Sequence, residues 1–322
     1  MNPKPQCILF ITSTYLGDAI ISTTAFEWLR SQYPDAKITI ACGHIAAPIF
    51  EAVPNLEQLY VIRKQKYGLH TLKLWWALCR KHWDYILDIR GTGIGYLMCS
   101  KHHKVWKSTQ NITQSRVQQI ATLLGLETPT PCKIYLAEKH RAEAKNLLPQ
   151  NRPILLLSPM ASWDKKCWPA QSFLELAKAL TAENGPLPNA AIGFLGDPKQ
   201  RPALLELLQA LPENQRIDIS GNINLLTLAA CMEQADLFVG NDSGLMHLAA
   251  AVGTSTLGIF GPSRPEVYAP FGSKADYIRV PMPYEQMMSS AQAGENHMDL
   301  LKTEDVLKSC LALIKTNSLD KK

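Results

Sequence analysis

The sequence lacks the features that mark disulfide-rich, zinc-binding and membrane-spanning proteins. Its eight cysteines are scattered, with no Cys-x-x-Cys pair and no cysteine–histidine cluster at zinc spacing. The thiols are therefore expected to be reduced and packed among apolar neighbours. No apolar run approaches the ~20 residues needed to cross a bilayer. The N-terminal stretch also lacks the layout of a signal peptide, and we expect a cytoplasmic protein.

Charged residues are few, at 19% of the chain, and hydrophobic residues make up 46%. This balance is typical of a soluble globular protein with ample core material. A chain of 322 residues is too long for one ordinary core and suits two domains. Internal repeats and low-complexity segments are also lacking, which argues against a solenoid or a linker-rich chain.

Short β-rich runs alternate with helical periods along the whole chain. "QCILFIT", "AKITIAC" and "YILDI" read as strands of the first half, and "PILLLSP" restarts the pattern near residue 150. Strands separated by helices predict a parallel sheet that is wound on both faces. We therefore expect two doubly wound α/β domains, 1–150 and 151–322, with the last helix as a candidate to pack back towards the first domain. Ligands would bind in a cleft at the carboxyl ends of the strands.

One segment is basic and aromatic. From Tyr60 to Gln110 the chain has ten Lys/Arg against two acids, together with four of its seven tryptophans. A helix in this segment is expected to pack Leu72, Trp76 and Cys79 inward while its cations are solvated. Two other interpretations are open at this point: base stacking on nucleic acid, and docking on anionic lipid head groups.

Two patterns in the same segment imitate known sites. The stretch "DIRGTGIGY" has the spacing G-x-G-x-G, whereas a dinucleotide loop needs its third glycine later, at the start of the first helix of the fold. His102 and His103 are adjacent, so their side chains point apart and suit no metal. We therefore expect neither a nicotinamide site nor a metal site here.

The stretch "NDSGLMH" carries the groups of an anion-binding site. Asp242 ends a predicted strand, and Ser243 and Gly244 open a helix whose free amides would face an anion. His247 shares that helix face. A serine hydrolase would need a G-x-S-x-G elbow, and a metal site for phosphate would need more than one carboxylate. The alternative is a capped helix with a core histidine.

Two further loops offer charged groups. "SPMASWDKKCWP" follows the first strand of the second half and brings Ser158, Ser162 and two lysines to the same edge, where a cation would stabilise a departing pyrophosphate. "FGPS", after a later strand, adds a second loop at this edge. Asp18 follows the first strand of the chain and is placed to act as a general base. Its alternative role is the N-cap of the helix at 19–32.

Taken together, these stretches resemble glycosyltransferase family 9, the bacterial ADP-heptose:lipopolysaccharide heptosyltransferases. The likeness extends over nearly the whole chain. It is carried by "ILFITSTYLGDAIISTTAFEWLRSQYPDAKITI", "WDYILDIRG", "KKCWP", "GNDSGLMHLAAAVGTSTLGIFGPSRPEVYAPFG" and "HMDLLKTEDVL". The resemblance implies a GT-B fold, in which the first Rossmann-like domain binds the acceptor and the second binds the nucleotide-sugar.

The resemblance also implies a reaction. The sugar would be transferred from an ADP-heptose to the anionic inner core of lipopolysaccharide, with inversion and without a tightly bound metal or other cofactor. The enzyme would work at the cytoplasmic face of the inner membrane, in peripheral contact with it, and would bind no nucleic acid. Asp18 matches the general base, and Lys166 matches the lysine that faces the departing phosphate.

The remaining site residues follow from the same match. The donor-binding set is Ser162, Asp242, Ser243, Gly244, His247, Gly261 and Pro262. The basic segment would bind the acceptor through Lys64, Lys66, Lys73, Arg90, Lys101 and Lys104. The chain departs from the family where a carboxylate contacts the nucleoside, because "GDPKQ" offers both Asp197 and Gln200. A different nucleotide-sugar donor and a non-catalytic nucleotide-sugar-binding relative therefore stay open as alternatives.

Overall fold

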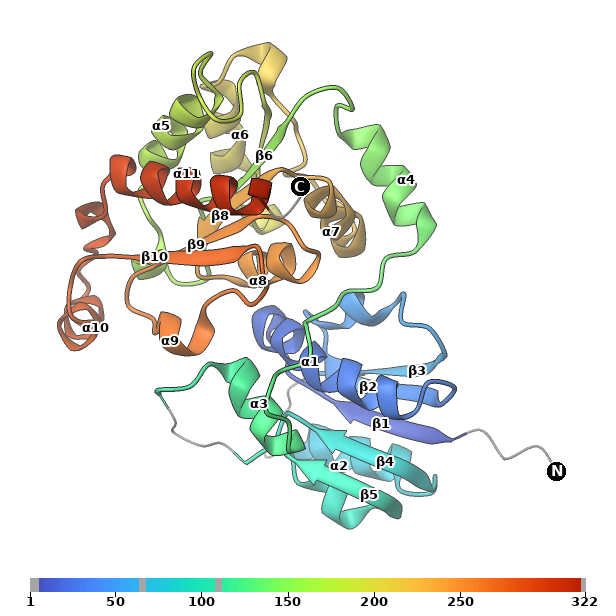
Figure 1. The fold of residues 1–322 in the computed structure, drawn as a ribbon. Helices are drawn as coiled ribbons and strands as arrows, with labels where there is room; N and C mark the ends of the chain where they lie inside the picture. The colour runs from blue at the N-terminus through green and yellow to red at the C-terminus, as the bar shows by residue number, and fades with distance from the viewer. Residues whose placement is uncertain (1–5, 64–67, 108–111, 320–322) are drawn as a thin grey trace. The chain divides into compact units, whose positions relative to one another are not determined.

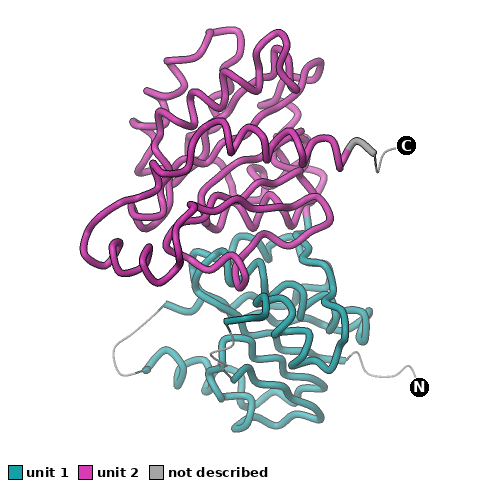
Figure 2. The backbone as a smooth tube through the Cα atoms, turned by 60° about the vertical axis from the view of Figure 1, so that its left-hand side comes forward, with its two compact units in different colours: residues 1–135 teal, residues 136–322 magenta. Residues whose placement is uncertain are grey.

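The computed structural model describes residues 6–63, 68–107 and 112–319, which fall into two compact units, Met1–Tyr135 and Leu136–Lys322 (Figure 2). Each unit has its own five-stranded parallel sheet with helices on both faces (Figure 1). The predicted doubly wound α/β class is confirmed. The units divide earlier than the expected residue 150, because α4 (Glu138–Leu147) packs on α7 (Leu225–Glu233) of the second unit.

Unit 1 is built on a sheet with the order β3-β2-β1-β4-β5. Its strands are β1 (Cys7–Ile11), β2 (Lys37–Gly43), β3 (Leu56–Ile62), β4 (Trp83–Asp88) and β5 (Ser100–Val105). The chain moves outward from β1 to β3 and then crosses to the other side of β1. The topological switch point of this sheet therefore lies between β1 and β4, where loops diverge and leave space for a ligand.

Alternate residues of β1 face two different helix layers. Phe10 packs with Phe26 of α1 (Leu16–Gln32) and Phe50 of the 3-10 turn η1 (Ala47–Phe50), at ring-centroid distances of 5.2 and 6.2 Å. Leu9 and Ile11 face the opposite layer, which comprises α2 (Leu69–Leu78) and η3 (Ile94–Leu97). Helix α3 (Arg116–Leu124) packs on α1 and ends at Gly125, whose φ of 81° is typical of a glycine C-cap.

Helix α2 turns a different face to the sheet than its sequence suggested. Leu74 and Leu78 are buried against it, and the Trp75 indole donates a hydrogen bond to the Leu97 carbonyl at 3.1 Å. Leu72 and Trp76, which we expected to pack inward, are 59% and 68% exposed. The prediction was wrong for these two residues because α2 turns Leu74 and Leu78 towards the cluster that contains Trp83, while Cys79 is half-buried.

Unit 2 has the sheet order β10-β9-β8-β6-β7. Its strands are β6 (Ile154–Ser158), β7 (Ala191–Phe194), β8 (Leu237–Asn241), β9 (Thr256–Phe260) and β10 (Ala275–Arg279). Here the chain goes from β6 to the edge strand β7 and then returns past β6 to form β8. The switch point of this sheet is therefore between β6 and β8.

The helices and 3-10 turns of unit 2 cover both faces of this sheet (Figure 1). Besides α4 and α7 they are α5 (Ala170–Thr181), α6 (Arg201–Gln209), α8 (Gly244–Ala251), α9 (Pro265–Tyr268), α10 (Tyr284–Gln292), α11 (Thr303–Leu319), η4 (Asp164–Lys166), η5 (Pro198–Gln200), η6 (Glu213–Gln215) and η7 (Met298–Leu300). The last helix, α11, packs on α5 and on strands β9 and β10 of its own unit.

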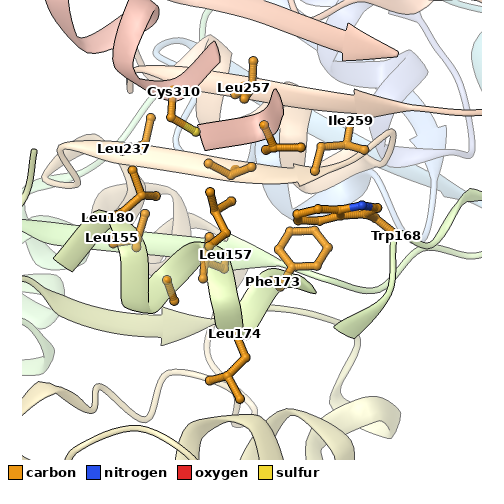
Figure 3. Close-up of a cluster of buried hydrophobic side chains, with 14 of the residues drawn as sticks. Leu155, Leu157, Trp168, Phe173, Leu174, Leu180, Leu237, Leu257, Ile259 and Cys310 are labelled. Atoms are coloured by element: carbon orange, nitrogen blue, oxygen red, sulfur yellow. The ribbon is translucent and has the colours of Figure 1, made fainter. Parts of the chain in front are cut away.

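A large apolar core lies between the sheet of unit 2 and helices α5, α6 and α11. Leu155 and Leu157 of β6 face it, and Figure 3 shows Trp168 beside Phe173 at one end of the cluster. The two rings meet edge to face at a centroid distance of 5.0 Å. The Trp168 indole also donates to the Leu301 carbonyl at 2.8 Å. This ring therefore fastens the end of the loop between β6 and α5 to the core.

Candidate functional site

The "NDSGLMH" stretch forms the predicted strand–turn–helix at the switch point of unit 2. The Asp242 amide continues the strand pairing by donating to the Ile259 carbonyl at 3.0 Å. Ser243 is extended, with φ −154°, and α8 begins at Gly244. The Ser243 side chain makes no capping hydrogen bond. The first turn of α8 therefore lacks the usual side-chain partner for its amides and presents the positive end of the helix dipole.

Three serine hydroxyls lie at the carboxyl ends of the adjacent strands β6, β8 and β9. They belong to Ser158, Ser243 and Ser263, and each oxygen is buried without a hydrogen-bond partner among the described residues. A buried hydroxyl without a partner costs about 1–3 kcal/mol, so three at one sheet edge are unusual for a site with only a structural role. They suit a ligand rich in acceptor oxygens, such as a diphosphate.

Lys166 supplies the cation of this edge. Its Nζ lies 2.5 Å from Oδ2 of Asp242, and the two side chains are 25% and 8% exposed. The neighbouring Lys165 instead donates to the Gly294 carbonyl on another loop. Of the two lysines in "DKKCWP", Lys166 is therefore the one beside the α8 turn.

The loop that carries Lys166 is held at both ends by one buried amide. Asn241 accepts a hydrogen bond from the Trp168 amide at 3.0 Å and donates one to the Pro159 carbonyl at 2.8 Å. Asn296 adds a third tie by donating to the Asp164 carbonyl at 3.1 Å. Because these bonds fix the backbone on either side of Lys166, its ammonium is positioned before any ligand arrives.

Asp18 lies at the corresponding edge of unit 1, in the first turn of α1. The N-cap of this helix is Tyr15, so the structure excludes Asp18 as the cap. Its side chain is partly exposed, and among the described residues no hydrogen bond or ion pair engages its carboxylate. The β1–α1 loop is tied to β2 by the Gly43 amide, which donates to the Ser13 carbonyl at 3.1 Å. Asp18 is thus an accessible carboxylate beside the switch point of its sheet.

The predicted acceptor cations are spread over unit 1. Arg90 follows β4 at the switch-point edge, and its Nη1 is buried without a partner in the described part of the chain. Lys101 lies near the opposite end of β5 and pairs with Asp84 at 2.5 Å. Lys104 donates to the Leu123 carbonyl at 2.8 Å, and Lys73 is exposed on α2. Arg90 follows the carboxyl edge on which Asp18 also lies, and Lys104, near the same end of β5, is already engaged by Leu123.

The other two predicted cations, Lys64 and Lys66, lie outside the described residues.

Comparison with known proteins identifies the family. The model of glycosyltransferase family 9 (heptosyltransferase) matches residues 85–297, well over half of the chain. The chain belongs to glycosyltransferase family 9. Among curated relatives, lipooligosaccharide heptosyltransferase 2 of Haemophilus influenzae is 25% identical over 85% of this chain and 88% of the relative. Lipopolysaccharide heptosyltransferase 2 of Escherichia coli is 24% identical over 91% of this chain and 94% of the relative.

Solved structures confirm the GT-B fold that the resemblance implied. A family 9 glycosyltransferase of Veillonella parvula superposes with a TM-score of 0.79 at 20% identity, covering 98% of this chain and 99% of that one. ADP-heptose lipopolysaccharide heptosyltransferase II of E. coli gives 0.74 at 22% identity, covering 97% and 100%. The protein is therefore a glycosyltransferase with two Rossmann-like sheets, as expected.

Several predicted residues of this glycosyltransferase have local roles as well. A Cβ at Gly261 would collide with Sδ of Met298, so the packing of the methionine side chains here favours glycine. Pro262 and His247 are buried, the latter one turn into α8. Ser162 is exposed on the Lys166 loop. Ser158 and Ser263 have the strongest geometric claim, although neither was in the predicted donor-binding set. The sequence had placed Ser158 and the loop that ends at Ser263 at this edge, because one is the last residue of β6 and the other follows β9 by three residues.

Asp197 and Gln200, the two candidates for a nucleoside contact, cap the same 3-10 turn. The Asp197 amide donates to Oε1 of Gln200 at 2.9 Å, and the Lys199 amide donates to Oδ1 of Asp197 at 2.9 Å. Both side chains lie beyond the carboxyl end of β7. One oxygen of each side chain is therefore engaged within the turn.

The glycine-rich stretch after β4 is a turn organised by one carboxylate. Asp88 accepts hydrogen bonds from the Gly91 amide at 2.9 Å, the Thr92 hydroxyl at 2.7 Å and the Gly93 amide at 3.0 Å. Burial raises the pKa of Asp88, and these hydrogen bonds oppose the shift. Gly91 and Gly93 have positive φ, of 71° and 76°, which explains the glycines through backbone conformation.

Over residues 6–63, 68–107 and 112–319, no three side chains of His, Cys, Asp or Glu are grouped so that they could hold a metal ion. In the same ranges, no helix combines the length and apolar composition required to span a bilayer.

Proposed function

We propose that this glycosyltransferase moves a heptose from an ADP-heptose donor to the inner core of lipopolysaccharide, with inversion at the anomeric carbon. The proposal is supported by the relatives, whose names describe lipopolysaccharide and lipooligosaccharide heptosyltransferases and which match over most of their length. The structural observation that supports the proposal is the group of three unpartnered serine hydroxyls at the carboxyl ends of β6, β8 and β9.

Unit 2 would bind the donor through its diphosphate. The hydroxyls of Ser158, Ser243 and Ser263 donate hydrogen bonds to phosphate oxygens, and the first turn of α8 adds backbone amides and the helix dipole. The Lys166 ammonium stabilises the charge that grows on ADP as it departs. With this cation at the leaving group, the proposed reaction needs no tightly bound metal or cofactor.

Unit 1 would bind the acceptor and activate it. The Asp18 carboxylate accepts the proton of the attacking hydroxyl, whose oxygen then forms a bond to the anomeric carbon. The bond from that carbon to the phosphate oxygen breaks at the same time, and ADP leaves with the electron pair. Arg90, with its unpartnered guanidinium nitrogen at the same edge, binds an anionic group of the acceptor. Such an acceptor is anchored in lipid, so the enzyme works at the cytoplasmic face of the inner membrane.

A nucleotide panel followed by a transfer assay tests the proposal. ADP is expected to raise the melting temperature, whereas UDP, GDP and CMP at the same concentration leave it unchanged. ADP-heptose and a heptose-free lipopolysaccharide core should then give a heptosylated product and ADP. Stabilisation by UDP or GDP instead of ADP would replace the heptose donor with another nucleotide-sugar. Absence of any transfer from ADP-heptose, with ADP bound normally, would overturn the proposed reaction.

A further inference from the structure

Helix α2 of unit 1 carries an apolar stripe on the side that faces away from its sheet. Leu69, Leu72 and Trp76 are 48%, 59% and 68% exposed. Their spacing of three and four residues places them on one helix face. The opposite face of the same helix, with Leu74 and Leu78, is buried in the core of unit 1. The outer stripe therefore does not contribute to the core of unit 1, and its burial against another surface would be favourable.

Cations lie along this part of the chain, and the sequence on either side of the stripe contains no acids. Lys73 is exposed between Leu72 and Trp76 in the sequence, and the guanidinium of Arg80 lies 5.8 Å from the centre of the Trp76 ring. From Gln58 to Trp83 the chain contains no Asp or Glu. Lys81 is paired with Glu57, whereas Lys73 and Arg80 form no ion pair within the described part of the chain and supply the uncompensated charge of α2 and the turn after it.

A pocket with charged walls opens beside α2. It has a volume of about 320 Å³ and lies between the end of β3 and the helix. Val61, Leu74 and Ala77 form part of its apolar wall, and Arg63 and Lys73 contribute the cations. A cavity of this size and chemistry suits a phosphate-bearing head group whose glycerol or acyl carbons contact the apolar wall.

We propose that the outer face of α2, defined by Leu69, Leu72, Lys73, Trp76 and Arg80, docks on the surface of an anionic phospholipid bilayer. Trp76 and the leucines enter the interfacial region, while Lys73 and Arg80 meet lipid phosphates. A second copy of this chain is a poor occupant, because it would bring the same cations to the contact. The proposal rests on the proposed function only in that a lipid-anchored acceptor gives the docking its purpose.

Vesicle flotation of the full-length protein tests this surface. We compare vesicles of phosphatidylcholine with vesicles of phosphatidylcholine and phosphatidylglycerol, and we expect binding to the anionic vesicles that weakens with added salt. The double variant Leu72→Ser/Trp76→Ser should bind anionic vesicles at least about tenfold more weakly, because the inserted apolar area is lost. Leu147→Ser, at a 39% exposed leucine of α4, is the matched control and should bind like the parent.

Two more measurements separate the possible failures. The affinity for ADP and the melting temperature of the double variant should equal those of the parent, because both serines replace exposed side chains. Equal binding of parent and double variant to anionic vesicles overturns the docking surface, and so does equal binding of the parent to both vesicle types. A dimer in the parent that disappears in the variant would assign the stripe to a second copy. Failure of the parent protein to bind ADP would instead contradict the proposed function and leave the docking surface untouched.

Discussion

The ammonium nitrogen of Lys166 and the carboxylate of Asp242 lie 2.5 Å apart at the switch point of unit 2. Of the pair, only the lysine can attract a diphosphate, since a carboxylate repels one. Asp242 therefore acts on the donor through Lys166, by holding its flexible side chain in one place while Asn241 holds the loop beneath it. The predicted donor-binding role of Asp242 becomes, in this account, a positioning role.

This division predicts a coupled pair of substitutions. Lys166→Ala should weaken ADP binding by about ten- to a hundredfold, the value of a charge-assisted hydrogen bond. As a single substitution, Asp242→Asn should weaken ADP binding, because Lys166 is no longer held in place. Added to Lys166→Ala, it should have almost no further effect on ADP affinity. Titration calorimetry of the parent, the two single variants and the double variant measures the four ADP affinities that this double-mutant cycle needs. Additive effects would show that Asp242 contacts the donor independently of Lys166.

The unpartnered serine hydroxyls predict an unusual combination of effects. Ser158→Ala and Ser263→Ala should leave the free energy of unfolding unchanged or raise it by up to about 1 kcal/mol, because each removes a buried hydroxyl that has no hydrogen bond. The same variants should bind ADP about three- to tenfold more weakly, the loss of one neutral hydrogen bond. Urea unfolding and calorimetry measure the two quantities.

Thr254 provides the control for the serine variants. Its hydroxyl donates to the Met232 carbonyl at 2.6 Å, before β9 and away from the carboxyl edge. Thr254→Val should therefore destabilise the protein and leave ADP affinity unchanged. Serine variants that behaved like Thr254→Val would make the three hydroxyls structural.

Asn241→Ala should disturb both stability and binding. The buried amide contacts Trp168 and Pro159, and its removal leaves an N–H and a carbonyl without partners. We expect a loss of about 2–4 kcal/mol in the free energy of unfolding, together with weaker ADP binding because the Lys166 loop is released. Unfolding midpoints measured with and without ADP distinguish the two contributions. A variant of normal stability that binds ADP normally would show that this amide does not organise the loop.

Asp18→Asn tests the base. The substitution keeps the shape of a side chain that has no partner among the described residues, so folding and ADP affinity should be unaffected. Turnover should fall at least about a hundredfold, as for the removal of a general base. Initial rates with ADP-heptose, compared at several pH values, provide the measurement. Turnover close to that of the parent would assign the proton transfer to another group.

The cysteines should differ sharply in reactivity. Burial raises the pKa of Cys42, with a nearby Arg90 opposing the shift, to about 12. Burial likewise raises the pKa of Cys231 and Cys310 to about 12. At pH 8 only about one such thiol in ten thousand is ionised, so iodoacetamide should spare them in the native protein. Cys99 is exposed and should be alkylated first. Mass spectrometry of native and urea-unfolded samples reads out each site, and rapid native labelling of Cys231 or Cys310 would contradict the packing of unit 2.

By itself, the sequence determined the local structure and the family. Strand and helix periods predicted two parallel sheets, and "NDSGLMH" predicted a turn that opens a helix, because backbone preference and apolar spacing act within a few residues. The likeness that extends from the first strand to the last helix is sufficient to indicate glycosyltransferase family 9, and the family model confirms it.

The tertiary structure decided which groups meet. Ser158 lies 85 positions before Ser243 in the chain. The strand order β9-β8-β6 brings the ends of these strands side by side, and only the structure shows that the hydroxyls of Ser158, Ser243 and Ser263 are buried there without partners among the described residues. The tertiary structure also decided which face of α2 is buried. Apolar residues extend around this helix, so periodicity alone could not distinguish its inner face from its outer face. Packing against Trp83 and β1 buried Leu74 and exposed Trp76. Local pattern specifies elements, whereas the pairing of distant strands specifies the site.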